Sequence, residues 1–361
     1  MHNYATSCII NWFTLPMQNG KKQITASILG ASGYSGAMAL RLLLRHPHVS
    51  VDKVFASSSI GEKVHTLYPS MRNMTDKIYE EYSHEKIENS NVIFIALPPE
   101  NAMHIVPQLL ESGKKIIDLS GDFRLKDAVK YKEYYKADHQ AINLLASASY
   151  GLPEINRAII EKTSLLSNPG CYPTSAIIPL APLLKNNLIE PEDISISSLS
   201  GASGAGRKAS LDLSFAEVDG SVKAYKVGDH QHIPEIESVL SGYSGKNVTV
   251  TFVPHLLPTV RGIYTTTFAT LKENINKDLI DEAFRHAYNN EPFVRYLGNQ
   301  LPELKSVVGS NFIDIGWKID AHSGKLIIFS AIDNLIKGAA GQAVQNMNIM
   351  CGFEETEALY L

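Results

Sequence analysis

The chain has 361 residues, of which 44% are hydrophobic and 19% charged, and its formal net charge is −4. This length is enough for two domains and a sizeable core. The slight negative charge argues against a general binder of nucleic acid or anionic membranes, and no apolar run approaches the roughly 20 residues that span a bilayer. Three cysteines without regular spacing (Cys8, Cys171 and Cys351) exclude a disulfide framework or a cysteine zinc site and favour a cytoplasmic location.

Residues 1–22 are predicted to form an N-terminal extension. An apolar patch at residues 8–15 has no basic residue before it, so it makes a poor signal peptide. The segment that begins at Met17 is typical of an ordinary cytoplasmic start. We therefore expect residues 1–16 to have no catalytic importance.

A glycine-rich turn follows the first predicted strand, residues 24–29, and leads into a predicted helix, residues 37–46, that Pro47 ends. In this strand–turn–helix context, glycines allow backbone N–H groups to approach a pyrophosphate at the helix N-terminus. The alternative is a tight turn that holds no ligand. The cofactor-binding candidates in the turn are Gly30, Ser32, Gly33, Tyr34, Ser35 and Gly36.

The second predicted strand, residues 49–56, indicates which dinucleotide binds. Sites for NAD usually place an acidic residue at the end of this strand to bind the ribose 2′-hydroxyl. Here the strand is followed by three hydroxyl residues, Ser57, Ser58 and Ser59, with Lys63 nearby. Hydroxyls and a cation accommodate a 2′-phosphate, so the sequence favours NADP over NAD.

Two further apolar runs, residues 92–97 and 115–120, flank a helical segment at residues 102–112. This alternation predicts an α/β fold with a Rossmann-type, doubly wound parallel sheet over residues 23–169. Ligands bind at the carboxyl ends of such strands, which makes Leu97, Pro98 and Arg124 site candidates. Arg124 could bind a carboxylate or phosphate with two parallel hydrogen bonds, or could form an ordinary ion pair with Asp122.

Cys171 is the candidate nucleophile. It lies in an irregular turn, residues 168–174, that contains two prolines and a glycine and precedes an apolar run. Thr174 or Ser175 can serve as the N-cap of a helix that begins within one turn of the sulfur. The positive end of that helix favours thiolate over thiol. The alternative is a small buried hydrophobic residue, which is common for free cysteine.

The next segments carry candidate phosphate and proton-transfer groups. A predicted strand at residues 193–200 leads into a second glycine-rich loop that ends in Arg207 and Lys208, which suits a phosphate-bearing ligand or a simple connection. Farther on, His230 and His232 stand two residues apart, and in an extended or turn segment both point the same way. They could exchange protons with a thiolate, could be structural, or could bind a metal, although no further ligands with suitable spacing appear.

The rest of the chain predicts an α+β catalytic and oligomerisation domain over residues 170–330, with a mixed or antiparallel sheet. Its further strands are expected at residues 247–253, 262–271, 307–319 and 325–330, with Arg261 in a connection between two of them. Residues 331–361 are expected to return to the first domain through a helix of small residues at 339–350.

With these residues in view, the chain resembles the N-acetyl-gamma-glutamyl-phosphate reductase family, which is related to aspartate-semialdehyde dehydrogenase. The matching stretches are residues 30–36, 119–125, 168–174, 200–207, 230–236, 253–262 and 333–345. By this resemblance Cys171 matches the catalytic cysteine and His230 the acid/base histidine, with His232 and Tyr225 beside them as candidate substrate-binding residues. The stretches that match NADP-contacting regions contain Gly30 to Gly36, Ser57 to Ser59, Ser203, Gly204, Gly206 and Asn334.

Two positions depart from the family pattern. The family often has arginine between the two histidines, where this chain has Gln231. It often has histidine after the Leu-Pro pair, where this chain has Pro99. The first departure concerns substrate binding, and the second concerns a local contact with the cofactor.

The resemblance implies NADPH-dependent reduction of an acyl phosphate to an aldehyde through a thioester on the cysteine, in arginine biosynthesis. Arg124, Arg207 and Arg261 are candidates for binding the substrate carboxylate and the leaving phosphate. Carrier-linked glutamyl or aminoadipyl phosphate, or aspartyl phosphate, is the alternative substrate. A cysteine hydrolase and a non-catalytic NADPH and thiol redox sensor are the rival functions. The resemblance also implies a homodimer or homotetramer.

Overall fold

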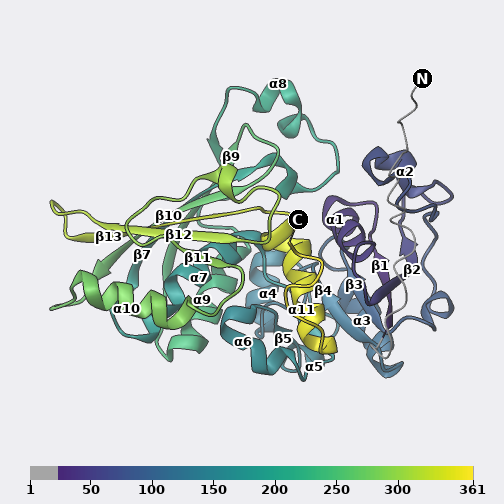
Figure 1. The fold of residues 1–361 in the computed structure, drawn as a ribbon, viewed down its shortest axis with the longest axis horizontal. Coiled ribbons are helices and arrows are strands. Elements are labelled where there is room, and N and C mark those ends of the chain that lie inside the picture. The colour runs from purple at the N-terminus through teal and green to yellow at the C-terminus, as the bar shows by residue number, and fades with distance from the viewer. Residues whose placement is uncertain (1–22, 361) are drawn as a thin grey trace, which may run out of the picture.

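The computed structural model describes residues 23–360, so the predicted extension at residues 1–22 lies outside the described residues. Two sheets stand side by side (Figure 1), the first built before Cys171 and the second after it. Within the described residues, no helix is long and apolar enough to cross a membrane.

The first sheet has six strands, all parallel, in the order β2-β1-β3-β4-β6-β5. Its strands are β1 (Ile24–Leu29), β2 (Val49–Phe55), β3 (Val92–Ile95), β4 (Lys115–Asp118), β5 (Ser149–Tyr150) and β6 (Leu165–Ser167). Every residue of β3 is buried, as expected for a strand covered by helices on both faces. The predicted doubly wound parallel sheet is confirmed, and its site candidates follow the carboxyl ends of β1 to β4.

The helix after the glycine-rich turn, α1 (Tyr34–Leu43), begins and ends three residues earlier than predicted. Gly33 is its extended N-cap residue, and no side chain caps it. The turn itself therefore supplies the helix N-terminus.

The second sheet has seven strands in the order β11-β12-β13-β10-β7-β9-β8. It is mixed, because β7 pairs with β9 and β11 with β12 in parallel while the other pairs are antiparallel. Its strands are β7 (Ile189–Gly201), β8 (Lys223–Ala224), β9 (Val250–Leu257), β10 (Ile263–Leu271), β11 (Val294–Tyr296), β12 (Ile313–Ile319) and β13 (Lys325–Ile332). The strand predicted from residue 307 begins at Ile313, because a 3-10 turn (Leu304–Ser306) and a loop precede it.

Helices α1, α7, α9 and α11 contribute to the site or pack beside it. The helices of the chain other than α1 are as follows. They are α2 (Val64–Leu67), α3 (Ala102–Glu111), α4 (Ala128–Tyr135), α5 (Ile142–Leu145), α6 (Pro153–Ile160), α7 (Cys171–Lys185), α8 (Phe215–Val218), α9 (His232–Ser244), α10 (Lys277–Tyr288) and α11 (Gly341–Cys351). Short 3-10 turns lie at Pro69–Met71, Glu85–Ile87, Ala202–Ala205 and Leu211–Leu213.

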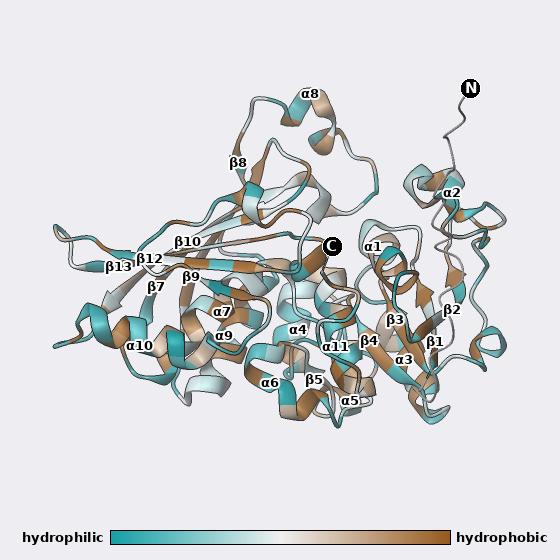
Figure 2. Ribbon diagram, in the orientation of Figure 1, coloured by the Kyte–Doolittle hydropathy of each residue, from teal (hydrophilic) through white to brown (hydrophobic). Residues whose placement is uncertain are grey.

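Helices α7, α9 and α10 lie along the same face of the second sheet (Figure 1), and the apolar side chains of that face form one core with α7 at its centre. Helix α10 alternates between hydrophilic and hydrophobic residues (Figure 2), as a helix with one solvent-facing side does. None of the long helices within residues 23–360 covers the opposite face of the sheet, and Phe268 there is 40% exposed.

The C-terminal segment returns to the first sheet. It begins with a π-helical turn, η6 (Ile336–Ala340), and continues as α11, instead of one regular helix from residue 339. Helix α11 packs against α1 and α6, and it is buried from Gly341 to Met350. Its polar side chains are consequently bonded inside the protein.

Candidate active site

Cys171 is the first residue of α7 and follows β6 after a three-residue turn. Gly170 is the N-cap residue, so the helix begins at the cysteine and not after Thr174 or Ser175. Those two hydroxyls donate backwards to the carbonyls of Gly170 and Tyr172, at 3.0 and 2.9 Å, which is a contact within the helix and not a cap. The expected cap was therefore wrong, and the sulfur lies closer to the helix N-terminus than predicted.

The thiol of Cys171 is nevertheless harder to ionise than the sequence suggested. Burial raises its pKa to about 11, although the positive charge of Arg124 and the backbone N–H groups of Tyr172 and Cys171 act in the opposite direction. A helix N-terminus contributes about 0.3–1 kcal/mol, which is less than the cost of removing a thiolate from water. The free protein therefore carries a protonated thiol at neutral pH.

We expect alkylation of Cys171 by iodoacetamide in the cofactor-free protein to accelerate about tenfold per pH unit, up to pH about 11, because only the thiolate reacts. The rate can be measured by mass spectrometry of the peptide that contains Cys171, from pH 6 to pH 10. A rate that levels off below pH 8 contradicts this expectation.

Arg124 braces the turn that precedes Cys171. Its Nε donates to the carbonyl of Asn168 at 2.9 Å, and its Nη2 donates to the carbonyl of Leu119 at 3.0 Å. Its ion-pair partner is Glu235, at 3.5 Å, and the side chain is only 9% exposed. The alternative pairing with Asp122 was wrong. The guanidinium also differs from the expected open carboxylate or phosphate ligand, because most of its hydrogen-bonding capacity is used within the protein.

Glu235 is the residue of this site that the sequence reasoning missed. It lies in the first turn of α9 and is fully buried. Its Oε1 accepts hydrogen bonds from the backbone N–H of Gly170 and from the Tyr150 hydroxyl, both at 2.8 Å. Arg124 and Glu235 thus hold the two ends of the cysteine turn. The available signal was a carboxylate three residues after the second histidine, within the stretch 230–236 that matches the family.

The two histidine rings lie together, with centroids 4.7 Å apart. Around His230, the rings of Tyr172, Tyr225 and Phe252 stand 5.5–5.7 Å away. Tyr225 is partly exposed, and its hydroxyl lies 3.0 Å from that of Tyr172. The expectation that a turn would bring both histidines to one side agrees with this geometry.

The two histidines differ in environment. Burial and, to a smaller extent, the charge of Lys226 lower the pKa of His230 to about 4, so the ring is neutral at pH 7. His232 is buried against the cysteine turn: a Cβ atom on Gly170 would lie 2.4 Å from His232 Nε2. His232 therefore packs behind the turn, and its predicted contact with the substrate stays a prediction.

The π-turn η6 forms the wall behind Cys171. A Cβ atom on Gly338 would lie 2.7 Å from the Cβ of Cys171, so only glycine allows this approach. Asp333 fixes the start of the turn by accepting hydrogen bonds from the N–H groups of Leu335 and Ile336, at 2.9 and 3.0 Å. The sequence reasoning did not single out Gly338.

Arg261 and Asn334 are held by protein partners. Arg261 Nη2 donates to the buried carboxylate of Asp333 at 2.8 Å, which leaves it less open to a substrate than predicted. The side chain of Asn334 is 2% exposed. It accepts a hydrogen bond from the Gly262 N–H at 2.7 Å and donates to Ser203 Oγ at 3.0 Å. Asn334 thereby fixes the second glycine-rich loop, and a direct contact with the cofactor is not its visible role.

The first glycine-rich turn has the geometry of a phosphate cradle. Gly30 has φ +80°, and a Cβ atom there would lie 2.3 Å from the carbonyl oxygen of Ala96. The N-terminus of α1 has no side-chain cap and no acidic residue in its first turn, so its N–H groups suit a pyrophosphate. The other cofactor candidates at this edge are Ser57, Ser58, Leu97 and Pro98, which are at least partly exposed, and Ser59, which is buried.

Arg207, Gly204 and Gly206 are exposed, and they belong to the second half of the chain. The charge of Arg207 opposes the rise in pKa that burial causes in Tyr68 and Tyr79. Tyr68 in turn donates a hydrogen bond to the carbonyl of Ser32, at 2.8 Å. Arg207 is therefore associated with the dinucleotide turn, and Gly204 and Gly206 lie on the same exposed loop.

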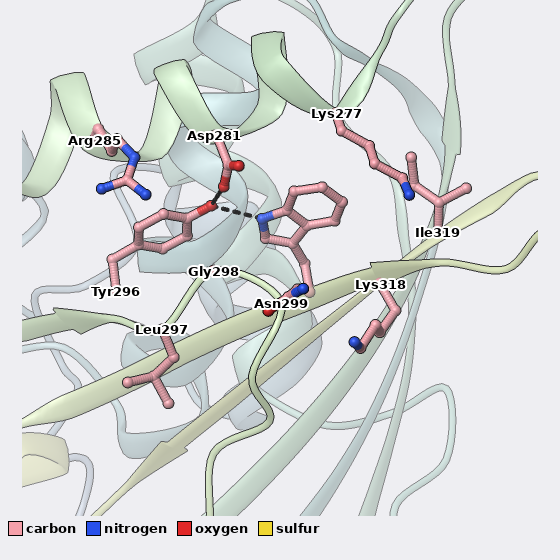
Figure 3. Close-up of a pocket in the computed structure, with 10 residues that line it drawn as sticks. Lys277, Asp281, Arg285, Tyr296, Leu297, Gly298, Asn299, Lys318 and Ile319 are labelled. Atoms are coloured by element: carbon pink, nitrogen blue, oxygen red, sulfur yellow. Dashed lines mark hydrogen bonds between the residues drawn. The ribbon is translucent and has the colours of Figure 1, made fainter.

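A separate pocket of about 420 Å³ lies between α10 and the edge of the second sheet (Figure 3). Its lining contains Trp317, whose indole N–H donates to the Tyr296 hydroxyl at 2.7 Å, and that hydroxyl also bonds to Asp281. The pocket shares no residue with the Cys171 cluster. Within residues 23–360, no group of three or more histidine, cysteine or acidic side chains is arranged to hold a metal ion.

The chain matches two family models. Residues 25–163 match the model described as semialdehyde dehydrogenase, NAD binding domain, and residues 171–334 match semialdehyde dehydrogenase, dimerisation domain. Among solved structures, aspartate semialdehyde dehydrogenase II from Vibrio cholerae is similar, with a TM-score of 0.72 and 16% identity over 92% of this chain and 99% of that one. The enzyme from Candida albicans, solved with NADP, has a TM-score of 0.68 and 16% identity, over 91% of this chain and 99% of that one.

Sequence relatives are much closer. The N-acetyl-gamma-glutamyl-phosphate reductase of Pelotomaculum thermopropionicum is 47% identical over 93% of this chain and 97% of that protein. The reductase of the same name from Desulfotalea psychrophila is 48% identical over 93% of this chain and 98% of that protein. The chain therefore belongs to the N-acetyl-gamma-glutamyl-phosphate reductase family.

Proposed function

We propose that this protein reduces N-acetyl-gamma-glutamyl phosphate to the corresponding semialdehyde with NADPH, through a thioester on Cys171, as a step of arginine biosynthesis. The observation that carries the proposal is the position of Cys171. It is the first residue of α7, and a three-residue turn separates it from β6, a strand of the sheet whose edge holds the dinucleotide turn. The reaction needs a reduced thiol and NADPH, which places it in the cytoplasm.

The residues at the edge of the first sheet fit NADP. The uncapped N-terminus of α1 takes the pyrophosphate, and hydroxyl residues instead of a carboxylate follow β2, where a 2′-phosphate arrives. Arg207 adds a positive charge from the second half of the chain. When bound, NADPH supplies a hydride to the acyl carbon. In this proposal residues 23–169 form the cofactor domain, 170–330 the catalytic domain and 331–361 the returning segment.

The chain's own residues supply the nucleophile and its support. Cys171 attacks the acyl phosphate, the carbon–oxygen bond to phosphate breaks, and the acyl group remains on sulfur as a thioester while the thiol proton leaves with the phosphate. A thioester accepts hydride more readily than a carboxylate does, which explains the need for sulfur. Arg124 and Glu235 keep the turn before Cys171 in place, and His230 contacts the reacting acyl group in this proposal.

The function is tested with purified protein, NADPH and a panel of acyl phosphates, by following the oxidation of NADPH. We expect the N-acetyl-gamma-glutamyl compound to give the highest kcat/KM. A higher value for a carrier-linked glutamyl or aminoadipyl phosphate, or for aspartyl phosphate, reassigns the substrate. Turnover without NADPH indicates a hydrolase, and NADPH binding without turnover of any acyl phosphate indicates a redox sensor.

Lys226 is the cation best placed for the leaving phosphate. Arg124 and Arg261 have buried acidic partners, and Arg207 faces the dinucleotide turn. Lys226 is exposed, its charge reaches His230, and its Nζ donates to Gln231 at 3.3 Å, beside the position where the family often has arginine. Its φ of +44° is unusual for a residue with a side chain, and such backbone strain is concentrated at functional sites.

We expect Lys226→Met to raise the KM for the acyl phosphate about tenfold and to leave the dissociation constant of NADPH unchanged, because one charge-assisted contact to phosphate is lost. In the reverse reaction, the KM for inorganic phosphate should rise by the same factor. Lys223→Met, which removes a nearby exposed lysine of β8, is the control and should change neither constant. Equal constants for Lys226→Met and the wild type contradict the assignment.

The open face of the second sheet is proposed to bind a second copy of the chain. Along β10 and β13, the side chains of this face alternate with side chains that point into the core. Four of them are apolar or aromatic and only partly covered: Tyr264, Phe268, Ile327 and Phe329. The family model that matches this half is described as a dimerisation domain. Burial of such a face stabilises a homodimer.

We expect Phe268→Lys to convert the dimer to a monomer, because the interface would then bury a charge without a partner. Light scattering after size-exclusion chromatography measures the mass. Val129→Lys, at a 76% exposed position of α4, is the matched control and should stay dimeric. A monomeric wild-type protein rules out this interface.

A further inference from the structure

Arg157, in α6, joins three segments that are distant in the sequence. Its guanidinium forms ion pairs with Glu291, in the connection after α10, and with Glu355, which follows α11. Nη1 and Nη2 donate to the two carboxylate oxygens of Glu291, the first at 2.9 Å. Nε and Nη2 donate to the two oxygens of Glu355, at 2.9 and 3.1 Å. Each carboxylate is thus held by two hydrogen bonds, which fix the orientation of the pair as well as its distance.

The two carboxylates belong to different parts of the molecule. Glu355 lies in the returning segment, whose helix α11 packs against α1 and α6, so its pair with Arg157 stays on the side of the cofactor domain. Glu291 follows α10, which lies along the second sheet (Figure 1), so its pair crosses from the cofactor domain to the catalytic domain. The hydrogen bond to Glu291 is also the largest cause that raises the pKa of Arg157.

The chain itself leaves the angle between the two domains open. Within residues 23–360, it crosses between the two sheets twice, after β6 and after β13. Both crossings lie beside Cys171, which follows the first, while Gly338 packs against it just after the second. Two neighbouring connections can act as a hinge, and domains joined in this way move unless contacts between them prevent it. The pair between Arg157 and Glu291 is such a contact, and the glutamate is only 10% exposed.

We propose that Arg157 and Glu291 are positioning residues for the hydride step, because their ion pair fixes the angle between the cofactor domain and the catalytic domain. This inference rests on the proposed reductase function. The dinucleotide turn belongs to the cofactor domain, whereas the helix that begins at Cys171 packs in the core of the catalytic domain. Hydride transfer therefore depends on how the two domains are set, and a displacement of about 1 Å between reacting groups can cost about 10²-fold in rate.

Acylation of the sulfur should depend much less on this pair. The turn before Cys171 is held directly by Arg124 and Glu235, which stay in place when Arg157 or Glu291 is replaced. The two half-reactions can be measured separately. Mass spectrometry of protein mixed with acyl phosphate, without NADPH, gives the rate of acylation. Addition of NADPH to the acylated protein then gives the rate of hydride transfer, from the loss of NADPH absorbance.

Glu291→Gln and Glu355→Gln form a matched pair of variants. Each removes one carboxylate from the same guanidinium, but only the first breaks a contact between the domains. We expect Glu291→Gln and Arg157→Met to slow hydride transfer about tenfold and to acylate Cys171 at close to the wild-type rate. Glu355→Gln should keep both rates close to those of the wild type. Unchanged dissociation constants for NADPH show that each variant is folded and binds the cofactor.

Arg295→Met controls for the loss of an arginine pair as such. Arg295 is 39% exposed, close to the 34% of Arg157, but it pairs with Asp314 inside the catalytic domain. This variant should keep the wild-type rate of hydride transfer. With NADPH deuterated at the transferred hydrogen, the isotope effect on turnover should be larger in Glu291→Gln than in the wild type, because the hydride step is then slower relative to the others.

Three results overturn the proposal: an unchanged rate of hydride transfer in Glu291→Gln, equal losses in Glu291→Gln and Glu355→Gln, or acylation that slows as much as hydride transfer. The last result would mean that the pair only supports the fold. A wild-type protein that forms no thioester on Cys171 instead overturns the reductase function, and this inference with it. The two failures are distinguishable, because acylation is measured in the wild type before NADPH is added.

Discussion

Replacement of Cys171 by serine is expected to abolish turnover, with a loss of about 10⁴-fold or more, while NADPH still binds. Serine has nearly the same size and keeps α7 in place, so the change removes the sulfur and little else. A serine hydroxyl is far less acidic than a thiol. An ester of serine would also accept hydride less readily than a thioester does.

The measurement is NADPH oxidation in the presence of the acyl phosphate, together with NADPH binding followed by fluorescence. Cys351→Ser, at the last residue of α11, is the matched control and should keep near wild-type turnover. Mass spectrometry of protein mixed with acyl phosphate, without NADPH, should show an acyl group on Cys171 in the wild type and none in Cys171→Ser. If Cys171→Ser retains turnover, the covalent route is wrong.

Local sequence signals were sufficient for four of the six strands of the first sheet. Apolar runs that end in loop residues predicted β1 to β4 and the turn after β1, whereas β5 and β6 were not predicted. They succeeded because each signal lies within a few residues of the feature that it specifies. The absence of a carboxylate after β2 is equally local, and it predicted the cofactor.

The connections across the site could not be predicted, because they join segments distant in the sequence. Nothing around Arg124 indicates that Glu235 is its partner, and no local pattern places Gly338 against Cys171. The prediction that the thiol of Cys171 would ionise easily was wrong for the same reason. The helix N-terminus was visible in the sequence, but the burial that outweighs it depends on how the whole site packs.

Short strands and the ends of helices also could not be predicted from local sequence patterns. Strands β8 and β11 have two and three residues, too few for a periodic pattern. The start of α7 was misplaced because serine and threonine are usual caps, whereas here their hydroxyls bond to carbonyls of the preceding turn. The π-turn η6 interrupts a run of small residues that reads as one continuous helix.

Lys337→Met is expected to lower the free energy of unfolding by about 3–5 kcal/mol. Lys337 lies in η6 and forms an ion pair with Glu154 at 2.6 Å, and both side chains are completely buried. Its Nζ also donates to Gln345 Oε1 at 2.9 Å, and it lies 5.8 Å from the centre of the Phe293 ring. Removal of the lysine leaves a carboxylate in the interior with no charge to balance it.

An ion pair of similar length at the surface should contribute much less to the free energy of unfolding than this buried pair does. Lys132 and Asp138 lie 2.8 Å apart, but their side chains are 64% and 70% exposed. Lys132→Met should therefore cost only about 0.2–1 kcal/mol. Urea unfolding of both variants gives the comparison, and equal losses would contradict the assignment of the large effect to burial.

The double variant Lys337→Met with Glu154→Leu tests more directly whether the unbalanced buried charge causes the loss of stability. Most of the cost of breaking a buried pair is the charge left behind, so replacement of both partners by apolar residues should restore most of the lost stability. Catalysis need not recover with it. Gly338, the neighbour of Lys337, packs against Cys171. A shift of η6 that leaves the free energy of unfolding unchanged therefore still moves the wall behind the sulfur. If stability recovers while kcat stays reduced, η6 has two separate roles: it stabilises the fold through Lys337, and it forms the wall behind Cys171 through Gly338.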